Sequence, residues 1–174
     1  MDSLTLRKAR PEDYPLVRAF YHDVIDRMEK AQYSPAWQKG IYPSDAYLAE
    51  LTARGEIYLG YLDQTPVAAM ALNHNCNESY AAAPWRVNAA PHEISVIHLL
   101  CVHPLYARRG LAKQLVKQAI ILSSGSKCIR LDVLAGNLPA LRLYEHMGFE
   151  HIVTLPMYYE DTGWTDFLLY ELPL

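Results

Sequence analysis

The chain has 174 residues, enough for one hydrophobic core, so we expect a single domain over residues 1–174. Apolar residues make up 51% and charged residues 20%, a composition typical of a globular protein in water. The 16 basic and 19 acidic side chains give a formal charge of −3, which argues against general binding of nucleic acid.

The N-terminal half is predicted to contain two helices and three strands. Proline and acidic residues open the first helix, and Ser44 and Gly55 are the expected N-cap and stop of the second. In chain order, the pattern predicts a strand over residues 3–9, a helix over 10–30, a loop over 31–43, a helix over 44–55, and antiparallel strands over 56–63 and 65–75.

The C-terminal half alternates strands with helices. After an irregular polar connection over 75–92, residues 93–102 are almost continuously apolar, as in a strand buried on both faces. The pattern continues with a helix over residues 110–124, a strand over 127–134, a helix over 137–148, and strands over 149–160 and 164–172. This alternation implies a locally parallel sheet flanked by antiparallel strands, so the predicted fold class is α/β with a mixed sheet.

Cysteine, histidine and hydropathy patterns indicate the compartment of the protein and whether it binds a metal or a membrane. Cys76, Cys101 and Cys128 form neither a CxxC pair nor a disulfide framework, which favours the reducing cytoplasm. The seven histidines lack the spacing of a metal site, so no metal is expected. No apolar run has the length of a membrane span, and the N-terminus lacks the apolar segment of a signal peptide, so no membrane partner is expected.

The segment VHPLYARRGLAKQLV, residues 102–116, joins the apolar strand to a helix through two arginines and a glycine. The first N–H groups of a helix lack intrahelical partners and, together with the helix dipole, favour an anion. Gly110 lets the backbone approach a ligand, and Arg108, Arg109 and Lys113 add positive charge. The segment is typical of a phosphate site, and a solvated turn is the alternative.

A second motif, NLPALRLYEHMGF, covers residues 137–149. Asn137 can cap this helix, and Pro139 suits its first turn. At helical spacing, Asn137, Ala140 and Tyr144 share one face, with Tyr144 about two turns from the cap. Taken alone, Tyr144 is either a core aromatic or a functional hydroxyl.

Together the two motifs resemble those of the GNAT superfamily of acyl-CoA-dependent N-acetyltransferases. The family's pyrophosphate signature, Q/R-x-x-G-x-G/A, is similar to ARRGLA at residues 107–112, where Ala107 replaces the usual Gln or Arg. The later signature, N-x-x-A-x-x-x-Y-E-x-x-G-F, is met by residues 137–149. Ala107 removes a side chain but no backbone N–H, so pyrophosphate binding is expected to survive. The resemblance covers nearly the whole chain and implies the GNAT fold, a central mixed sheet with helices on both faces.

The resemblance implies that acetyl-CoA is the co-substrate, in a V-shaped opening between the strands at 94–102 and 128–134. Backbone near Leu100 would pair with the pantetheine and polarise the thioester carbonyl, a contribution that can reach about 3–4 kcal/mol per N–H donor. The implied cofactor-binding residues are Leu100, Cys101, Val102, Ala107, Arg108, Arg109, Gly110, Leu111, Ala112, Lys113, Asn137, Ala140 and Tyr144.

Transfer to an amine requires a neutral nitrogen, which costs about 4.6 kcal/mol at pH 7 for a lysine-like amine with a pKa of about 10.4. Glu93 and His98 are the candidate bases, and a buried structural role is the alternative for His98. On an extended strand, His98 is expected to share a face with Leu100. The resemblance implies that Tyr144 protonates the departing CoA thiolate. Cys101 is expected on the opposite face from His98, in a packing role and not as a nucleophile.

The resemblance implies that the acceptor amine binds on the far side of these strands, bounded by the first helix-loop-helix segment and the last two strands. Aromatic residues there would suit a small cationic amine through cation–π contacts, with Glu160 and Asp161 adding negative charge. Packing of these aromatics beneath a long loop is the alternative. The candidate substrate-binding residues are Tyr33, Trp37, Tyr42, His74 and Tyr158.

Three functions stay open at this point. The aromatic loop favours a small-molecule N-acetyltransferase, whereas a protein N-terminal or lysine acetyltransferase would need an open peptide groove. The third is a non-catalytic acyl-CoA sensor, and the presence of Tyr144 argues against it. The resemblance also implies a homodimer through the apolar C-terminal strand at 164–172.

Overall fold

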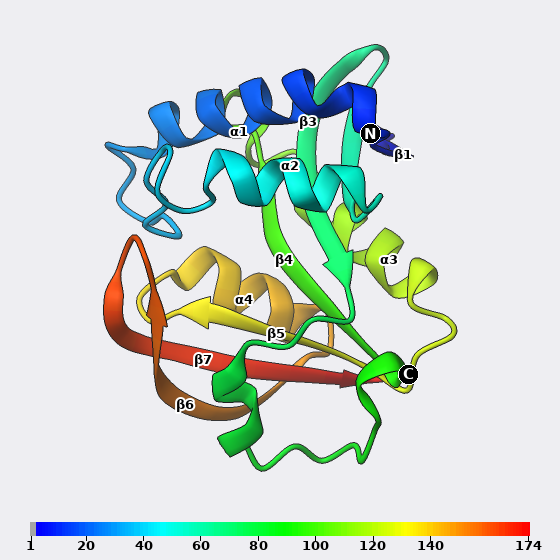
Figure 1. Ribbon diagram of the computed structural model, residues 1–174, viewed down its shortest axis with the longest axis vertical. Coiled ribbons are helices and arrows are strands. Elements are labelled where there is room, and N and C mark those ends of the chain that lie inside the picture. The colour runs from blue at the N-terminus through cyan, green and yellow to red at the C-terminus, as the bar shows by residue number, and fades with distance from the viewer. Residues whose placement is uncertain (1–2) are drawn as a thin grey trace.

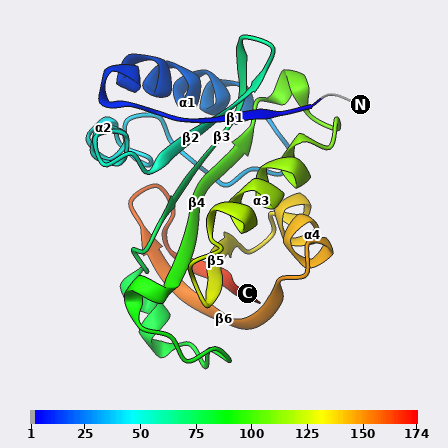
Figure 2. The same ribbon diagram turned by 90° about the vertical axis from the view of Figure 1, so that its right-hand side faces the viewer.

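The computed structural model describes residues 3–174, in which seven strands form one mixed sheet (Figures 1 and 2). The strands are β1 (Thr5–Lys8), β2 (Ile57–Leu62), β3 (Thr65–Asn73), β4 (Ile94–Val102), β5 (Cys128–Leu134), β6 (Glu150–Tyr159) and β7 (Gly163–Pro173). Their order across the sheet is β1-β2-β3-β4-β5-β7-β6. The central pair β4–β5 is parallel and its neighbours pair antiparallel, so the predicted mixed sheet is confirmed.

Four α-helices lie on the two faces of this sheet. They are α1 (Tyr14–Met28), α2 (Asp45–Ala53), α3 (Leu111–Leu122) and α4 (Leu138–His146). Ser44 caps α2 as predicted, because its Oγ accepts a hydrogen bond from the backbone N–H of Tyr47 at 3.1 Å. Gly55 follows the end of that helix with a φ of +66°, a conformation that favours glycine. No helix of residues 3–174 has the length and apolarity needed to cross a membrane.

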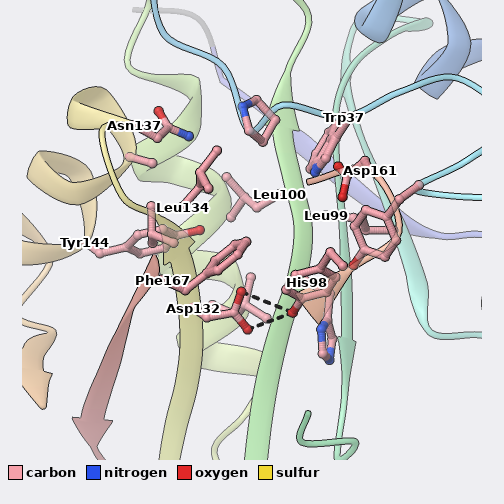
Figure 3. A pocket seen from close by; sticks show the side chains of 16 residues that line it. Trp37, His98, Leu99, Leu100, Asp132, Leu134, Asn137, Tyr144, Asp161 and Phe167 are labelled. Carbon is pink, nitrogen blue, oxygen red and sulfur yellow. Dashed lines mark hydrogen bonds between the residues drawn. The ribbon is translucent and has the colours of Figure 1, made fainter. Parts of the chain in front are cut away.

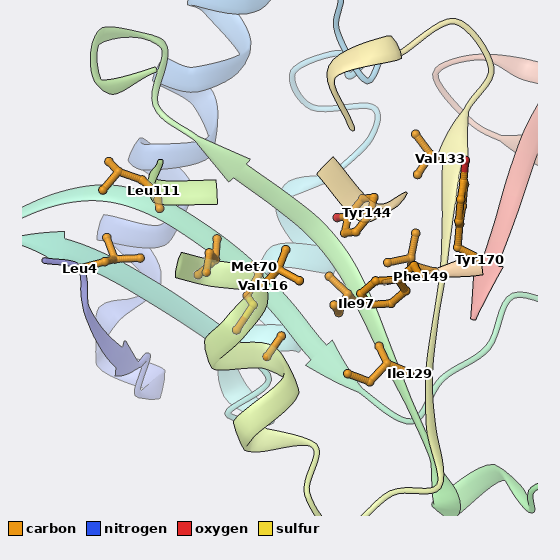
Figure 4. Packing of buried hydrophobic residues seen from close by; sticks show 14 of the residues in the cluster. Leu4, Met70, Ile97, Leu111, Val116, Ile129, Val133, Tyr144, Phe149 and Tyr170 are labelled. Carbon is orange, nitrogen blue, oxygen red and sulfur yellow. The ribbon is translucent and has the colours of Figure 1, made fainter. Parts of the chain in front are cut away.

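Two layers of apolar side chains hold the helices to the sheet. On one face α3 and α4 contribute Leu111, Val116 and Tyr144 to a cluster with residues of β3, β4 and β5 (Figure 4). On the other face α1 and α2 pack Val17, Tyr21, Leu48 and Leu51 against residues of β2, β3 and β4. Helices α1 and α3, on opposite faces of the sheet, each bury one stripe of apolar residues at helical spacing.

The connection between β3 and β4 is irregular, as predicted, but it is anchored to the sheet. It contains two short 3-10 helices, η2 (Glu78–Ala82) and η3 (Pro91–Glu93), and Tyr80 of η2 is buried. A buried ion pair joins Arg130 Nε to Glu171 Oε2 at 2.9 Å. The other oxygen of Glu171 accepts the backbone N–H groups of residues 86 and 87, both at 3.0 Å. These contacts fix the connection against β5 and β7.

The C-terminal strand β7 is internal, with β5 on one side and β6 on the other. Phe167, Leu169 and Tyr170 of this strand are buried in the core. The apolar character of residues 164–172 therefore follows from core packing. The free edge at this end of the sheet belongs to β6, and the expected homodimer stays a prediction.

The strands β4 and β5 separate after a short paired segment. They pair at three positions, from Ile94 with Cys128 to Val96 with Arg130. Beyond them, β4 contains a bulge at Leu99, which has a φ of +54°, and its register with β3 shifts. The two strands therefore diverge and leave the predicted V-shaped opening.

Candidate active site

The opening between β4 and β5 leads to two cavities that meet. The inner cavity has a volume of about 100 Å³ and lies among β4, β5, the start of α4 and the β6–β7 hairpin (Figure 3). The outer groove has a volume of about 660 Å³ and runs between α4 and the segment that leads into α3. Both are lined by Pro35, Leu100, Asn137 and Ala140. These four residues therefore form the junction between the cavity and the groove.

The outer groove contains the N-terminus of α3. Gly110 precedes this helix with a φ of +75°, and the first helical hydrogen bond is donated by the backbone of residue 114 to the Gly110 carbonyl. The N–H groups of residues 111–113 therefore have no intrahelical partners, and these residues line the groove. Arg108 and Lys113 line it as well. Unpaired N–H groups, a helix dipole and two cations together favour a diphosphate.

The groove collects most of the residues that the resemblance assigned to the cofactor. It is lined by Leu100, Cys101, Val102, Ala107, Arg108, Gly110, Leu111, Ala112, Lys113, Asn137 and Ala140. The Arg109 guanidinium instead lies 5.1 Å from the centre of the Tyr106 ring, which itself lines the groove. Tyr144 lines the inner cavity (Figure 3).

Asn137 occupies the N-cap position of α4 without capping it through its side chain. The backbone makes the turn instead, because the Asn137 carbonyl accepts the N–H groups of Ala140 and Leu141, both at 3.1 Å. The predicted side-chain cap is therefore wrong. Asn137 lines both cavities at their junction, and Figure 3 shows its side chain at the inner one. Its amide can both donate and accept hydrogen bonds.

Tyr144 is a core aromatic residue that also reaches the inner cavity. It is only 6% exposed and packs edge-on against Phe149 with ring centres 5.5 Å apart, as a core aromatic does. It also lines the inner cavity. Burial raises the pKa of its phenol, so the hydroxyl keeps its proton at neutral pH and can donate a hydrogen bond.

The bulge in β4 decides which face each residue of that strand takes. Ile97, Leu100 and Val102 all contact the α3–α4 side, whereas Leu99 and Cys101 pack on the α1–α2 side. The strict alternation expected from the sequence is therefore interrupted between residues 97 and 100. A buried hydroxyl holds the bulge, because Tyr21 of α1 donates a hydrogen bond to the Leu99 carbonyl at 2.9 Å.

His98 does not share a face with Leu100, so that prediction was wrong (Figure 3). Its Nε2 lies 2.9 Å from Oδ1 of Asn73 on β3. Burial lowers the pKa of His98 to about 4, so the imidazole is neutral at pH 7. Glu93 is the last residue of η3, directly before β4, pairs with Lys127 at 2.9 Å and lines neither cavity.

Sequence reasoning missed Asp132 of β5, whose carboxylate lies in the inner cavity (Figure 3). The hydroxyl of Tyr80 donates to its Oδ2 at 2.8 Å, and the hydroxyl of Tyr159 donates to the same oxygen at 3.0 Å. Burial is the largest influence on this carboxyl and raises its pKa, although both hydrogen bonds oppose the rise. The available signal was a single acid in the otherwise apolar run LDVL.

Aromatic side chains form much of the wall around Asp132. Trp37 and Tyr42 line the inner cavity as predicted, joined by Tyr159 and Phe167, while Tyr33 lines the outer groove. Two other predicted residues lie elsewhere. The Nδ1 of His74 is 2.7 Å from the carbonyl of residue 94, and the exposed Tyr158 packs against Trp164 with ring centres 5.9 Å apart.

Two further observations limit the chemistry of the site. Cys101 is 4% exposed, and burial raises the pKa of its thiol, so a thiolate is disfavoured. Within residues 3–174, no three His, Cys, Asp or Glu side chains gather closely enough to hold a metal ion.

Comparisons with known proteins point to one family. The sequence profile of the acetyltransferase (GNAT) family matches residues 22–149. An uncharacterized protein of Mycobacterium leprae is 33% identical over 90 residues, which are 52% of this chain and 24% of that relative, so the match spans about a quarter of its length. The ribosomal protein bS18 alanine N-acetyltransferase of Escherichia coli is 27% identical over 106 residues, 59% of this chain and 72% of that enzyme.

A solved structure shares the whole fold. The crystal structure of Arabidopsis thaliana NAA60 in complex with acetyl-CoA superimposes with a TM-score of 0.69 at 18% identity, covering 99% of this chain and 100% of that one. The family profile spans most of the chain and includes both motifs. The chain therefore belongs to the GNAT family of acetyltransferases.

Proposed function

We propose that this protein transfers an acetyl group from acetyl-CoA to a primary amine of a small molecule, by direct attack in a ternary complex. The observation that carries the proposal is the junction of the inner cavity with the outer groove at Leu100, Asn137 and Ala140. A thioester lying in the groove would present its acetyl group at this junction. An amine in the inner cavity would meet it there, next to Tyr144.

Acetyl-CoA matches the chemistry of the outer groove. The N-terminus of α3, with Arg108 and Lys113, would hold the diphosphate. The backbone of β4 at Leu100–Val102 is separated from β5 and would pair with the amides of the pantetheine. The complex of the similar Arabidopsis thaliana NAA60 with acetyl-CoA supports this assignment.

The transfer itself needs an oxyanion donor and a partner for the leaving sulfur. In the proposed step the amine nitrogen bonds to the carbonyl carbon, and the carbon–sulfur bond then breaks. A backbone N–H of the β4 bulge near Leu100 would stabilise the oxyanion. The Tyr144 hydroxyl would donate to the departing thiolate, and its raised pKa keeps that donor protonated. Glu93 and His98 stay predictions as bases.

Direct attack is favoured over an acetyl-cysteine intermediate. Cys101 is the cysteine that lines the groove, and its buried thiol has a raised pKa. It packs among apolar residues of α1 and α2, and its thiol forms a hydrogen bond with the backbone of Ala69. A nucleophilic thiolate requires a base within hydrogen-bond distance or a lowered pKa.

A small acceptor is favoured by the size of the inner cavity, which at about 100 Å³ holds a few atoms of the acceptor. The second candidate is a protein N-terminus. It is favoured by the similarity to an enzyme that acetylates an alanine of ribosomal protein bS18. A peptide would place only its first residue in the cavity, so both acceptors would present the same reactive group.

A two-part experiment tests the proposal. Acetyl-CoA is titrated into the purified protein in a calorimeter, and thiol release is then followed with alkylamines, amino acids, lysine peptides and peptides with a free N-terminal alanine. Binding followed by turnover of a small amine supports the proposal. Turnover of peptides alone would support the second candidate. Tight binding without turnover of any amine would instead support an acyl-CoA sensor.

Localisation and assembly are proposed with the activity. We place the protein in the cytoplasm, because three free cysteines suit a reducing compartment. The homodimer expected from the resemblance is tested by light scattering on the purified protein.

A further inference from the structure

The inner cavity contains the carboxylate of Asp132. Asp132 lies on β5 across the opening from Leu100, and both residues line the same cavity (Figure 3). The Tyr80 and Tyr159 hydroxyls hold its Oδ2, while its Oδ1 lies 3.2 Å from the Tyr159 hydroxyl. Two tyrosines from different segments therefore fix the orientation of one partly exposed carboxylate.

We propose that Asp132 is the catalytic residue that binds the ammonium group of the acceptor and accepts its proton. This inference rests on the proposed function and names the acceptor class, an amine that is cationic at neutral pH. The side chain touches the acceptor directly, so the role is distinct from the positioning roles of Tyr80 and Tyr159.

The surroundings of Asp132 match a cation. The aromatic residues Trp37, Tyr42, Tyr159 and Phe167 line the cavity, and aromatic rings attract a cation. Asp161 supplies a second acid, and its Oδ1 is buried with no hydrogen-bond partner among residues 3–174. An unpaired buried carboxylate oxygen is costly, and an ammonium donor in the cavity would satisfy it.

The reaction also requires a group in the inner cavity that accepts a proton from the ammonium. An alkylammonium with a pKa of about 10.4 is neutral in only about one molecule in 2,500 at pH 7. In the proposed sequence the ammonium gives one proton to the Asp132 carboxylate, and the neutral nitrogen attacks the thioester carbon. As the carbon–sulfur bond breaks, Tyr144 gives its proton to the departing thiolate and takes up the second proton of the nitrogen, which restores its hydroxyl. Asp132 then releases its proton to solvent.

Burial makes this carboxylate a stronger base than a surface aspartate, because its pKa is raised from the usual range. Turnover requires the ionised carboxylate, so kcat/KM falls as the pH drops through the raised pKa of Asp132. The titratable groups around it are Tyr80 of η2, Tyr159 of β6, Asp161 of the β6–β7 turn, Tyr144 of α4, His98 of β4, Tyr42 before α2 and Tyr47 within it.

The test compares Asp132→Asn with Asp166→Asn, the same substitution at an exposed position of β7 that lines neither cavity. Binding of benzylamine to the CoA-saturated protein is measured by calorimetry, with aniline as the amine that is neutral at pH 7. Thiol release is measured in parallel from pH 5 to 9. We expect Asp132→Asn to retain acetyl-CoA affinity, to lose its preference for benzylamine over aniline, and to lower kcat/KM by about 100-fold or more.

The variant Tyr80→Phe distinguishes a catalytic role of Asp132 from a purely structural one. Tyr80→Phe removes a hydrogen bond that stabilises the ionised carboxylate, so the acid limb of the pH profile moves to higher pH. A purely structural role for this network would lower activity without moving that limb. The inference is overturned if Asp132→Asn turns over benzylamine within about threefold of Asp166→Asn, or if Tyr80→Phe leaves the acid limb in place.

The outcomes also distinguish the inference from the proposed function. Turnover that is insensitive to Asp132→Asn overturns the inference and leaves the proposed function standing. Benzylamine binding that depends on Asp132, without turnover of any amine, supports the ammonium site and overturns the transferase. Absence of both binding and turnover overturns both.

Discussion

The Tyr21 hydroxyl on α1 is predicted to stabilise the β4 bulge at Leu99, which shapes the active site. Tyr21 is fully buried, and its hydroxyl donates to the Leu99 carbonyl at 2.9 Å. Leu99 is 6% exposed and has a φ of +54°, which is unfavourable for a residue with a side chain. The change Tyr21→Phe removes this donor and leaves the ring in place, so its effect reports on the hydrogen bond alone.

The magnitude follows from the burial of both groups. A buried carbonyl that loses its partner costs about 1–3 kcal/mol. The strained φ adds no cost to the variant, because the strain is already present in the wild type. We therefore expect Tyr21→Phe to lower the free energy of unfolding by about 1–3 kcal/mol. The adjacent N–H of Leu100 loses its fixed direction as the bulge relaxes, so turnover is expected to fall by about tenfold.

Urea denaturation of Tyr21→Phe and Tyr14→Phe provides a matched comparison on one helix. The hydroxyl of Tyr14 also donates to a carbonyl, that of Asp45 at 3.2 Å, but Tyr14 is only half-buried. Water can replace this bond, so Tyr14→Phe should cost less than about 1 kcal/mol. Equal unfolding free energies for the two variants, within about 0.5 kcal/mol, would refute the role assigned to Tyr21.

Four further substitutions test separate parts of the site. Tyr144→Phe should lower kcat by about 100-fold or more with acetyl-CoA affinity retained in calorimetry, and a collapse of that affinity would make the residue structural. Gly110→Glu should abolish acetyl-CoA binding, because it places bulk and negative charge at the N-terminus of α3, whereas Gly125→Glu beyond the other end should leave binding unchanged. Equal affinities in these two folded variants would contradict the diphosphate assignment. Cys101→Ala should keep kcat within about threefold, and a loss of turnover with normal acetyl-CoA binding would revive the covalent route. Glu171→Ala should lower the free energy of unfolding by about 3–5 kcal/mol in urea, since it leaves a buried guanidinium unpaired, and a loss below about 1 kcal/mol would show that water reaches the pair.

The order of strands and helices could be predicted because each element depends on residues close together in the chain. Apolar spacing identified β4 and α3, and Ser44 and Gly55 bounded α2, through contacts that span three or four residues. The same holds for the turn around Gly110, where a positive φ and free N–H groups arise within one helical turn. Family resemblance then placed these local features in one groove.

Strand alternation failed at β4 for a long-range reason. A bulge reverses the faces of the residues after it, and the residue in the bulge carries a side chain that gives no local signal of a positive φ. The Leu99 conformation is held instead by a hydroxyl 78 residues away in the sequence. The misplaced face of His98 follows directly from this.

The sequence by itself determined the helix boundaries, the turn around Gly110 and the position of Tyr144 on α4, because each of these depends on residues that lie within a few positions of one another in the chain. The tertiary structure alone decided that Asp132 lies opposite Leu100, with Tyr80 52 residues before it and Tyr159 27 residues after it. Such a site exists only once β4 and β5 diverge and the connection from β3 packs against the sheet. Its contacts depend on chain segments that no periodic pattern relates to one another.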